Sequence, residues 1–99
     1  MFTVFSKKSC PYCVKAISFI REELRLESAI YDVNEYPDAH CLVVESTGHM
    51  TVPAIYIGEN FIGGYDDLIS MHDNKSLKSL ILEEKGRLLN LRGPNYKKI

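Results

Sequence analysis

Several features are scarce or missing in this chain of 99 residues, and each absence excludes a class of protein. The 12 Lys and Arg nearly balance the 13 Asp and Glu, so the formal net charge is only -1. A dedicated nucleic-acid-binding domain would carry a dominant basic surface, which this composition does not supply. No apolar stretch approaches the roughly 18 residues needed to span a bilayer. We therefore expect neither nucleic acid nor a membrane as a partner.

Cysteine is also scarce. Three cysteines are an odd number and too few for a small domain held together by disulfides. Residues 2–5 follow Met1 directly and have neither the basic start nor the long apolar core of a secretory signal. These observations favour a protein of the reducing cytoplasm. The length corresponds to one domain, residues 1–99, with a modest core.

Hydrophobic and turn-forming residues predict an alternation of strands and helices. Strands are expected at 1–5, 29–33, 52–57 and 61–62, the last two joined by a turn at 58–60. Helices are expected from Pro11 to about 27, at about 37–47, near 65–72, and from about 75 to 90. The second of these helices ends before Gly48, and the last one brings Leu88 and Leu89 to the core. This order predicts an α/β fold, a small sheet with helices on both faces.

The most informative segment is Cys10-Pro11-Tyr12-Cys13, between a predicted strand and a predicted helix. Cys10 falls at the helix N-terminus, beside Lys7 and Lys8, where unpaired N–H groups and cationic charge favour a thiolate. Cys13 falls one turn further in, where this help is weaker and burial opposes ionisation. Cys10 is therefore the expected nucleophile, and Cys13 the thiol that breaks the resulting mixed disulfide.

Metal-binding interpretations of the cysteine pair are weak. A structural zinc site needs a second pair of ligands at suitable spacing. The remaining candidates are His40, Cys41, His49 and His72, which repeat no such spacing. Covalent haem attachment needs His directly after the second cysteine, where this chain has Val14. We predict no metal site, and we expect Cys41 to be an inert helix residue.

Two further motifs complete a pattern. Thr51-Val52-Pro53 and the run GGYDDL at 63–68 follow CPYC in order and spacing. With Ser6-Lys7 ahead of the cysteines, the chain strongly resembles the dithiol (CPYC-type) glutaredoxins over almost its whole length. The resemblance implies a thioredoxin-like fold with a four-stranded mixed β-sheet flanked by helices. It also implies a monomeric, glutathione-dependent thiol-disulfide oxidoreductase that reduces protein disulfides and glutathione mixed disulfides. Glutathione would be a reducing cosubstrate with no further cofactor, and ribonucleotide reductase is a family-level protein substrate.

The resemblance also implies roles for individual residues. Pro53 would follow a cis peptide bond, and the Val52 backbone would pair with the cysteinyl part of glutathione. Asp67 would meet the γ-glutamyl ammonium, and Lys7 the glycyl carboxylate. The implied catalytic residues are Cys10 and Cys13, and the implied glutathione-binding residues are Lys7, Tyr12, Thr51, Val52, Pro53, Gly64, Tyr65, Asp66 and Asp67.

Alternatives remain for residues and for function. Lys7 with Lys8 could be an ordinary solvated pair, and Asp66 with Asp67 could be helix N-terminal residues favoured by the dipole. The basic residues from Lys85 onward are expected to form a solvated tail.

Relatives often carry Arg or Lys just before the TVP motif, whereas this chain has His49-Met50, and a protonated His49 could supply part of that charge. The alternative functions are a thioredoxin-like reductase of the same fold and an iron–sulfur cluster carrier using glutathione, the latter disfavoured by Pro11.

Overall fold

The computed structural model describes residues 1–97, with side chains described for 1–87. In chain order the elements are β1 (Phe2–Ser6), α1 (Pro11–Ser18), a π-helical turn η1 (Phe19–Glu23), β2 (Ser28–Asp32), α2 (Pro37–Thr47), β3 (Ala54–Ile57), β4 (Asn60–Gly63), α3 (Tyr65–Asp73) and α4 (Ser76–Lys97).

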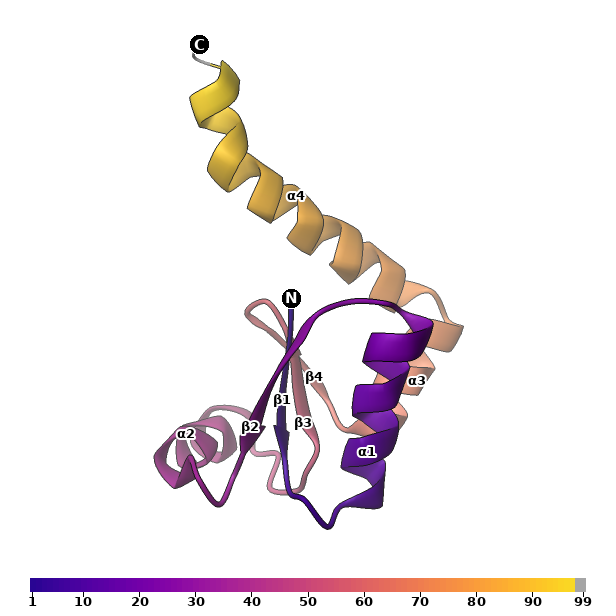
Figure 1. The fold of residues 1–99 in the computed structure, drawn as a ribbon, viewed down its shortest axis with the longest axis vertical. Helices are drawn as coiled ribbons and strands as arrows, with labels where there is room; N and C mark the ends of the chain where they lie inside the picture. Colours follow the sequence, from indigo (N-terminus) through magenta and orange to yellow (C-terminus); the bar gives the residue numbers. More distant parts are fainter. Residues whose placement is uncertain (98–99) are drawn as a thin grey trace.

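The four strands form one mixed sheet in the order β2-β1-β3-β4. Strand β1 runs parallel to β2 and antiparallel to β3, and β3 pairs with β4 as a hairpin. Helices α1 and α3 lie together on one side of the sheet and α2 lies on the other (Figure 1). The expected thioredoxin-like arrangement, a four-stranded mixed sheet flanked by helices, is confirmed.

The sheet separates two apolar cores, and the alternation of side chains along the central strands decides which residue enters which. Phe2 and Val4 point to the α1 and α3 side, where they pack with Ile55 among the fully buried residues. Phe5 points to the opposite face and packs with Val43 of α2. Burying each of these side chains contributes about 1.5–3 kcal/mol. Because β1 is covered on both faces, it needs apolar residues at successive positions, which explains its weak sequence alternation.

The predicted helix from Pro11 to about 27 is wrong in its second half. The α-helix ends at Ser18 and continues as the π-helical turn, in which the Leu24 N–H donates to the Phe19 carbonyl at 3.0 Å. Arg25 then adopts a left-handed backbone conformation (φ 55°), which a helix cannot continue through. The wider turn buries Ile20, and Leu24 packs against the same core.

Two other boundaries have clear physical causes. Strand β3 begins at Ala54 rather than 52, because Pro53 has no N–H to donate to a neighbouring strand. Helix α2 has the predicted bounds and ends at Gly48, whose φ of 74° is the left-handed conformation expected of a C-terminal glycine.

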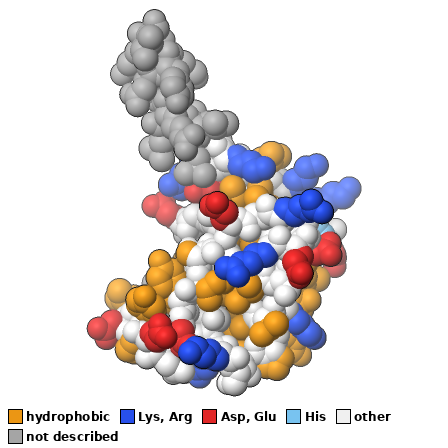
Figure 2. All heavy atoms as spheres, in the orientation of Figure 1, with side chains coloured by type: hydrophobic (Ala, Val, Ile, Leu, Met, Phe, Trp, Pro, Cys, Tyr) orange, Lys and Arg blue, Asp and Glu red, His pale blue; other side chains and the backbone are white. Residues whose placement is uncertain are grey.

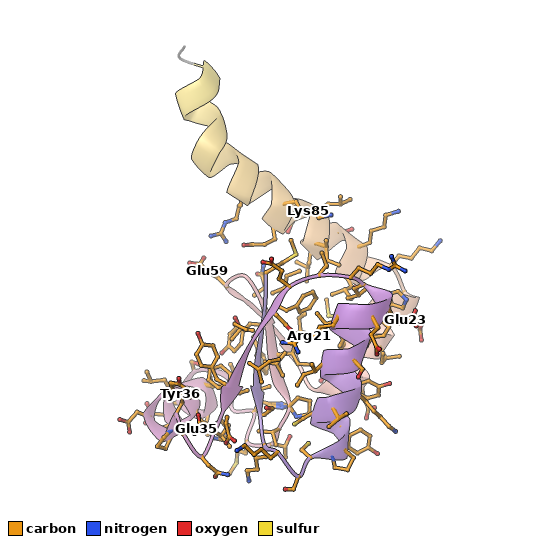
Figure 3. The ribbon with its side chains drawn as sticks, in the orientation of Figure 1. Arg21, Glu23, Glu35, Tyr36, Glu59 and Lys85 are labelled. Carbon is orange, nitrogen blue, oxygen red and sulfur yellow. The ribbon has the colours of Figure 1, made fainter. Side chains whose placement is uncertain are left out.

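Helix α4 extends beyond its predicted end near 90, to Lys97. Leu77 buries the first turn of α4 in the core. Further along the helix, Arg87 Nη1 lies 3.5 Å from Glu59 Oε2 in the β3–β4 turn. Figure 3 shows Glu59 at this turn, beside the part of α4 that carries Lys85. The predictions that Leu88 and Leu89 join the core, and that the basic residues after Arg87 are solvated, concern side chains outside the described part.

The described surface mixes charges of both signs. On the face in Figure 2, Lys and Arg side chains are interspersed with Asp and Glu. None of the helices in the described part combines the length and apolar character needed to cross a bilayer.

Candidate active site

Cys10 is the N-cap residue of α1. Its backbone is extended (φ -96°, ψ 109°), and its Sγ accepts the N–H of Cys13 at 3.2 Å. A helix N-terminus leaves several N–H groups without partners, and an electron-rich cap atom is stabilised there. Serine or aspartate oxygen usually takes this role, so the capping position favours negative charge on the Cys10 sulfur.

The same sulfur faces the loop that precedes β3. The distance from Cys10 Sγ to the Val52 carbonyl oxygen is 3.7 Å. Pro53 is buried, and the Val52–Pro53 peptide bond is cis, as the resemblance implied. The loop therefore places a backbone carbonyl beside the half-buried thiol.

A groove with a volume of about 230 Å³ begins at this loop. Its lining comes from the start of α1, the loop before β3 and the start of α3. The lining residues are Tyr12, His49, Thr51, Val52, Pro53, Gly64, Tyr65, Asp66 and Asp67. Three segments far apart in the chain thus form one concave surface, and it contains every predicted binding residue except Lys7.

The start of α3 closes one side of the groove. Gly63 has a φ of 122°, a conformation that residues with side chains rarely adopt. The Asp67 carboxylate accepts the N–H of Gly64 at 2.9 Å and so caps the helix. The capping interpretation of Asp67 is therefore correct, and the same carboxylate lines the groove. Asp66 is exposed beside it, so two acidic residues mark this part of the site.

Comparison with known proteins identifies the family. The Glutaredoxin family model matches residues 2–62 of this chain. The chain belongs to the glutaredoxin family. Its CPYC pair makes it a dithiol glutaredoxin. It is 38% identical over 81 residues to Glutaredoxin-1 of Rhizophagus irregularis, covering 79% of each chain. It is 34% identical over 84 residues to Glutaredoxin-1 of Saccharomyces cerevisiae, covering 79% of this chain and 76% of the relative.

Solved glutaredoxins have the same architecture. A buckwheat glutaredoxin–glutathione complex superposes with a TM-score of 0.74 at 26% identity, covering 85% of this chain and 78% of the other. A dithiolic glutaredoxin of Trypanosoma brucei brucei gives a TM-score of 0.69 at 32% identity, covering 80% of this chain and 84% of the other.

The second cysteine of this glutaredoxin has a different environment from the first. Cys13 is buried, with 1% of its surface exposed. Burial, followed by hydrogen bonding to Cys10, raises the pKa of Cys13 to about 12, although the Lys7 backbone and charge oppose the shift. Cys13 is consequently a neutral thiol at neutral pH. Both cysteines are free, as is Cys41, which is exposed on α2.

Aromatic rings form part of the groove wall. The rings of Tyr12 and Tyr65 are tilted against each other with centroids 5.9 Å apart, and Tyr12 remains 55% exposed. The ammonium of Lys15 lies 5.3 Å from the centroid of the Tyr12 ring. The two tyrosines line the groove of the glutaredoxin together with the acidic residues.

Lys7 and His49 differ most from expectation. Lys7 is exposed in the loop before α1, outside the groove lining, so its contact with a ligand stays a prediction. His49 lines the groove although it was not among the predicted binding residues. The signal available in the sequence was its place just ahead of Thr51. Among the described residues, no cluster of three His, Cys, Asp or Glu is placed to hold a metal ion.

Proposed function

We propose that this glutaredoxin is a glutathione-dependent thiol-disulfide oxidoreductase that reduces glutathione mixed disulfides and protein disulfides. The observation that carries the proposal is the Cys10 sulfur, 3.7 Å from the carbonyl of Val52, at a groove that ends in acidic side chains. The buckwheat relative, whose structure was solved with glutathione, supports glutathione as the thiol that this protein uses.

Glutathione fits the groove by charge and by shape. An extended tripeptide can pair its cysteinyl backbone with Val52, which puts its sulfur beside Cys10. Its γ-glutamyl ammonium then meets Asp66 and Asp67. The glycyl carboxylate extends towards the exposed Lys7. The chain thus offers opposite charges to the two ends of the tripeptide.

Reduction of a glutathione mixed disulfide needs only Cys10. Its thiolate attacks the glutathionyl sulfur and forms a Cys10–glutathione disulfide, while the substrate leaves as a thiolate and takes up a proton. A second glutathione thiolate attacks the glutathionyl sulfur of this intermediate. Oxidised glutathione forms, and Cys10 returns as a thiolate.

Reduction of a protein disulfide uses both cysteines. Cys10 attacks one sulfur of the substrate, and the other substrate sulfur leaves as a thiolate. Cys13 then loses its proton and attacks Cys10, which releases the second substrate thiolate and leaves a Cys10–Cys13 disulfide. Two glutathione molecules reduce that disulfide and become oxidised glutathione. Because this cycle consumes reduced glutathione, we place the protein in a reducing compartment such as the cytoplasm, with glutathione as cosubstrate.

The test is an assay coupled to glutathione reductase, with two single variants. Cys13→Ser should retain turnover of a small glutathione mixed disulfide but lose reduction of protein disulfides. Cys10→Ser should lose both activities. Turnover that persists in Cys10→Ser would refute the assignment. Re-reduction by thioredoxin reductase, with no response to glutathione, would instead support the thioredoxin-like alternative.

A further inference from the structure

His49 connects the loop before β3 to three neighbouring elements. Its backbone N–H donates to the Thr47 hydroxyl of α2 at 3.0 Å. Its ring meets the Phe61 ring of β4 edge-on, with centroids 5.3 Å apart. On another side it lies against the start of α3, where a Cβ added to Gly64 would be 3.6 Å from His49 Cε1. The half-buried imidazole is therefore held in a fixed place in the groove wall.

The hydrogen bonds of the ring determine where its proton lies. His49 Nε2 is 3.2 Å from the Pro53 carbonyl oxygen and 3.3 Å from Thr51 Oγ1. A carbonyl oxygen can only accept, so the contact with Pro53 is a hydrogen bond when Nε2 carries a hydrogen and donates it. In the neutral ring this leaves Nδ1 without a proton. In that tautomer the Thr51 hydroxyl accepts from the same N–H, and its own hydrogen is available to a ligand.

We propose that His49 is a positioning residue that holds the Thr51–Pro53 segment in the conformation that binds glutathione. The Val52 carbonyl faces the Cys10 sulfur and the next carbonyl, that of Pro53, faces the imidazole. The segment is thus held from both sides before a ligand arrives. A prearranged binding segment loses less conformational freedom on binding. This inference rests on the proposed function for its effect on glutathione.

The proposed role does not depend on the charge of the ring. Both the neutral Nε2–H form and the imidazolium can donate to Pro53, so either form can make the contact. The neighbouring elements present Thr47 and Phe61, which are uncharged. The carboxylates of Asp66 and Asp67 and the hydroxyls of Tyr12 and Tyr65, from α1 and α3, line the same groove. The contact with Pro53 therefore does not require a charged ring.

Three variants separate this role from a general structural one. His49→Leu removes the donor, and we expect KM for a glutathione mixed disulfide to rise about 3- to 10-fold with kcat little changed. His49→Gln keeps an N–H donor without a titrating charge and should restore KM to within about 2-fold of wild type. Met50→Ala is the matched control, because Met50 is the neighbouring side chain, 76% exposed and outside the groove lining.

A second measurement does not need activity. Nitrogen NMR of the imidazole in the ligand-free protein should show the Nε2–H tautomer at a pH where the ring is neutral. An Nδ1–H tautomer would overturn the proposal, as would a His49→Gln variant that behaves like His49→Leu. A wild-type KM that falls as the ring becomes protonated, with no such fall in His49→Gln, would replace positioning by charge attraction.

The two proposals fail in different ways. If His49→Leu does not fold, as judged by its thermal unfolding, the NMR result and the His49→Gln kinetics still decide the matter. If the wild type shows no glutathione-dependent turnover while NMR finds the Nε2–H tautomer, the proposed function fails and the contact to Pro53 stands. If the wild type shows glutathione-dependent turnover but NMR finds the Nδ1–H tautomer, the proposed function stands and the contact to Pro53 fails.

Discussion

Two helices of this protein begin at the same groove, and their first residues are capped by different atoms. The cap of α1 is the sulfur of Cys10, which accepts the N–H of Cys13. The cap of α3 is the carboxylate of Asp67, which accepts the N–H of Gly64. Both atoms satisfy a backbone donor that would otherwise be unpaired. The sulfur, however, can form a covalent bond to another sulfur, whereas the carboxylate takes no part in disulfide chemistry.

The comparison shows one physical device used for two purposes. At α1 the exposed N–H groups stabilise the sulfur that the proposed function assigns as the nucleophile. At α3 they stabilise a carboxylate that stays in place, and the proposed function assigns this carboxylate to recognition of a positively charged group. Changing each cap separately should therefore affect different properties of the protein.

The largest effect is expected from changing the cap of α1. Cys10→Ser should abolish turnover, by at least about three orders of magnitude, because the nucleophile is lost. Stability should stay within about 1 kcal/mol, because a serine hydroxyl is a good N-cap. Thermal unfolding combined with the coupled assay measures both. A variant that loses its fold along with its activity would mean that the sulfur contributes more to the helix than its capping bond.

The next effect separates the two cysteines of α1. The pKa of Cys13 is raised from 9.0 to about 12, mainly by burial. At pH 9 to 10 the folded protein should react with iodoacetamide at Cys10 and at the exposed Cys41, while Cys13 stays unmodified unless the chain is unfolded. Mass spectrometry of the digested protein measures the modification at each position. Modification of folded Cys13 as fast as Cys41 at pH 9 would contradict the burial argument.

The same shift has a consequence for stability. In the unfolded chain Cys13 loses its proton near its ordinary value of 9.0, while in the folded chain it keeps the proton up to about 12. The unfolded state binds fewer protons in this window, so stability should fall as pH rises, by up to about 1.4 kcal/mol per pH unit. Denaturant unfolding of wild type against Cys13→Ala, from pH 8 to about pH 11, isolates this contribution. If the free energy of unfolding changes with pH in the same way in the two proteins, Cys13 makes no such contribution.

A smaller effect is expected from the cap of α3. Asp67→Ala should cost about 1 kcal/mol of stability, by analogy with the loss of other helix caps. It should also raise KM for a glutathione mixed disulfide about 10-fold, through the loss of a charge-assisted contact. Asp67→Asn keeps an oxygen that can accept from Gly64 but removes the charge. Compared with Asp67→Ala, the Asp67→Asn variant should therefore recover more of the lost stability than of the increase in KM. Equal recovery of stability and of KM would show that the carboxylate acts only as a cap.

The smallest effect is expected at Asp66, which lies in the first turn of α3 but makes no capping bond comparable to that of Asp67. Asp66→Asn should change stability by about 0.3–1 kcal/mol through the helix dipole, and this change should shrink as salt is added. A loss as large as that of Asp67→Ala would show that the cap is shared between the two residues. Unfolding curves at low and high salt provide the measurement.

Much of this organisation could be predicted because the informative residues are local. CPYC, TVP and GGYDDL are short motifs whose residues lie next to each other, and each marks one segment of the groove. The π-helical turn at Phe19–Glu23 has no such signal, because it depends on how Ile20 and Leu24 reach the core. The predicted end of α4 near residue 90 is too early: Gly93 and Pro94 disfavour a helix, yet the backbone is helical through them to Lys97.

The contacts of His49 and Asp67 were beyond sequence reasoning for another reason. Asp67 could be expected to bind a ligand or to cap a helix, and only the hydrogen bond to Gly64 in the structure shows that it caps. His49 reaches Phe61 and Gly64 from a different loop. Such contacts depend on how separate segments pack, which a single sequence does not record.

The attachment of α4 has a practical consequence. Glu84 is buried against the turn at Gly58, and Arg87 links that carboxylate to Glu59. The helix then leaves the sheet at the end opposite the loop between β1 and α1 (Figure 1). A fluorophore, affinity handle or solid support joined to the far end of α4 would be carried away from the thiols. The protein is therefore suited to immobilised or fused redox reporters in which the groove stays open to solution.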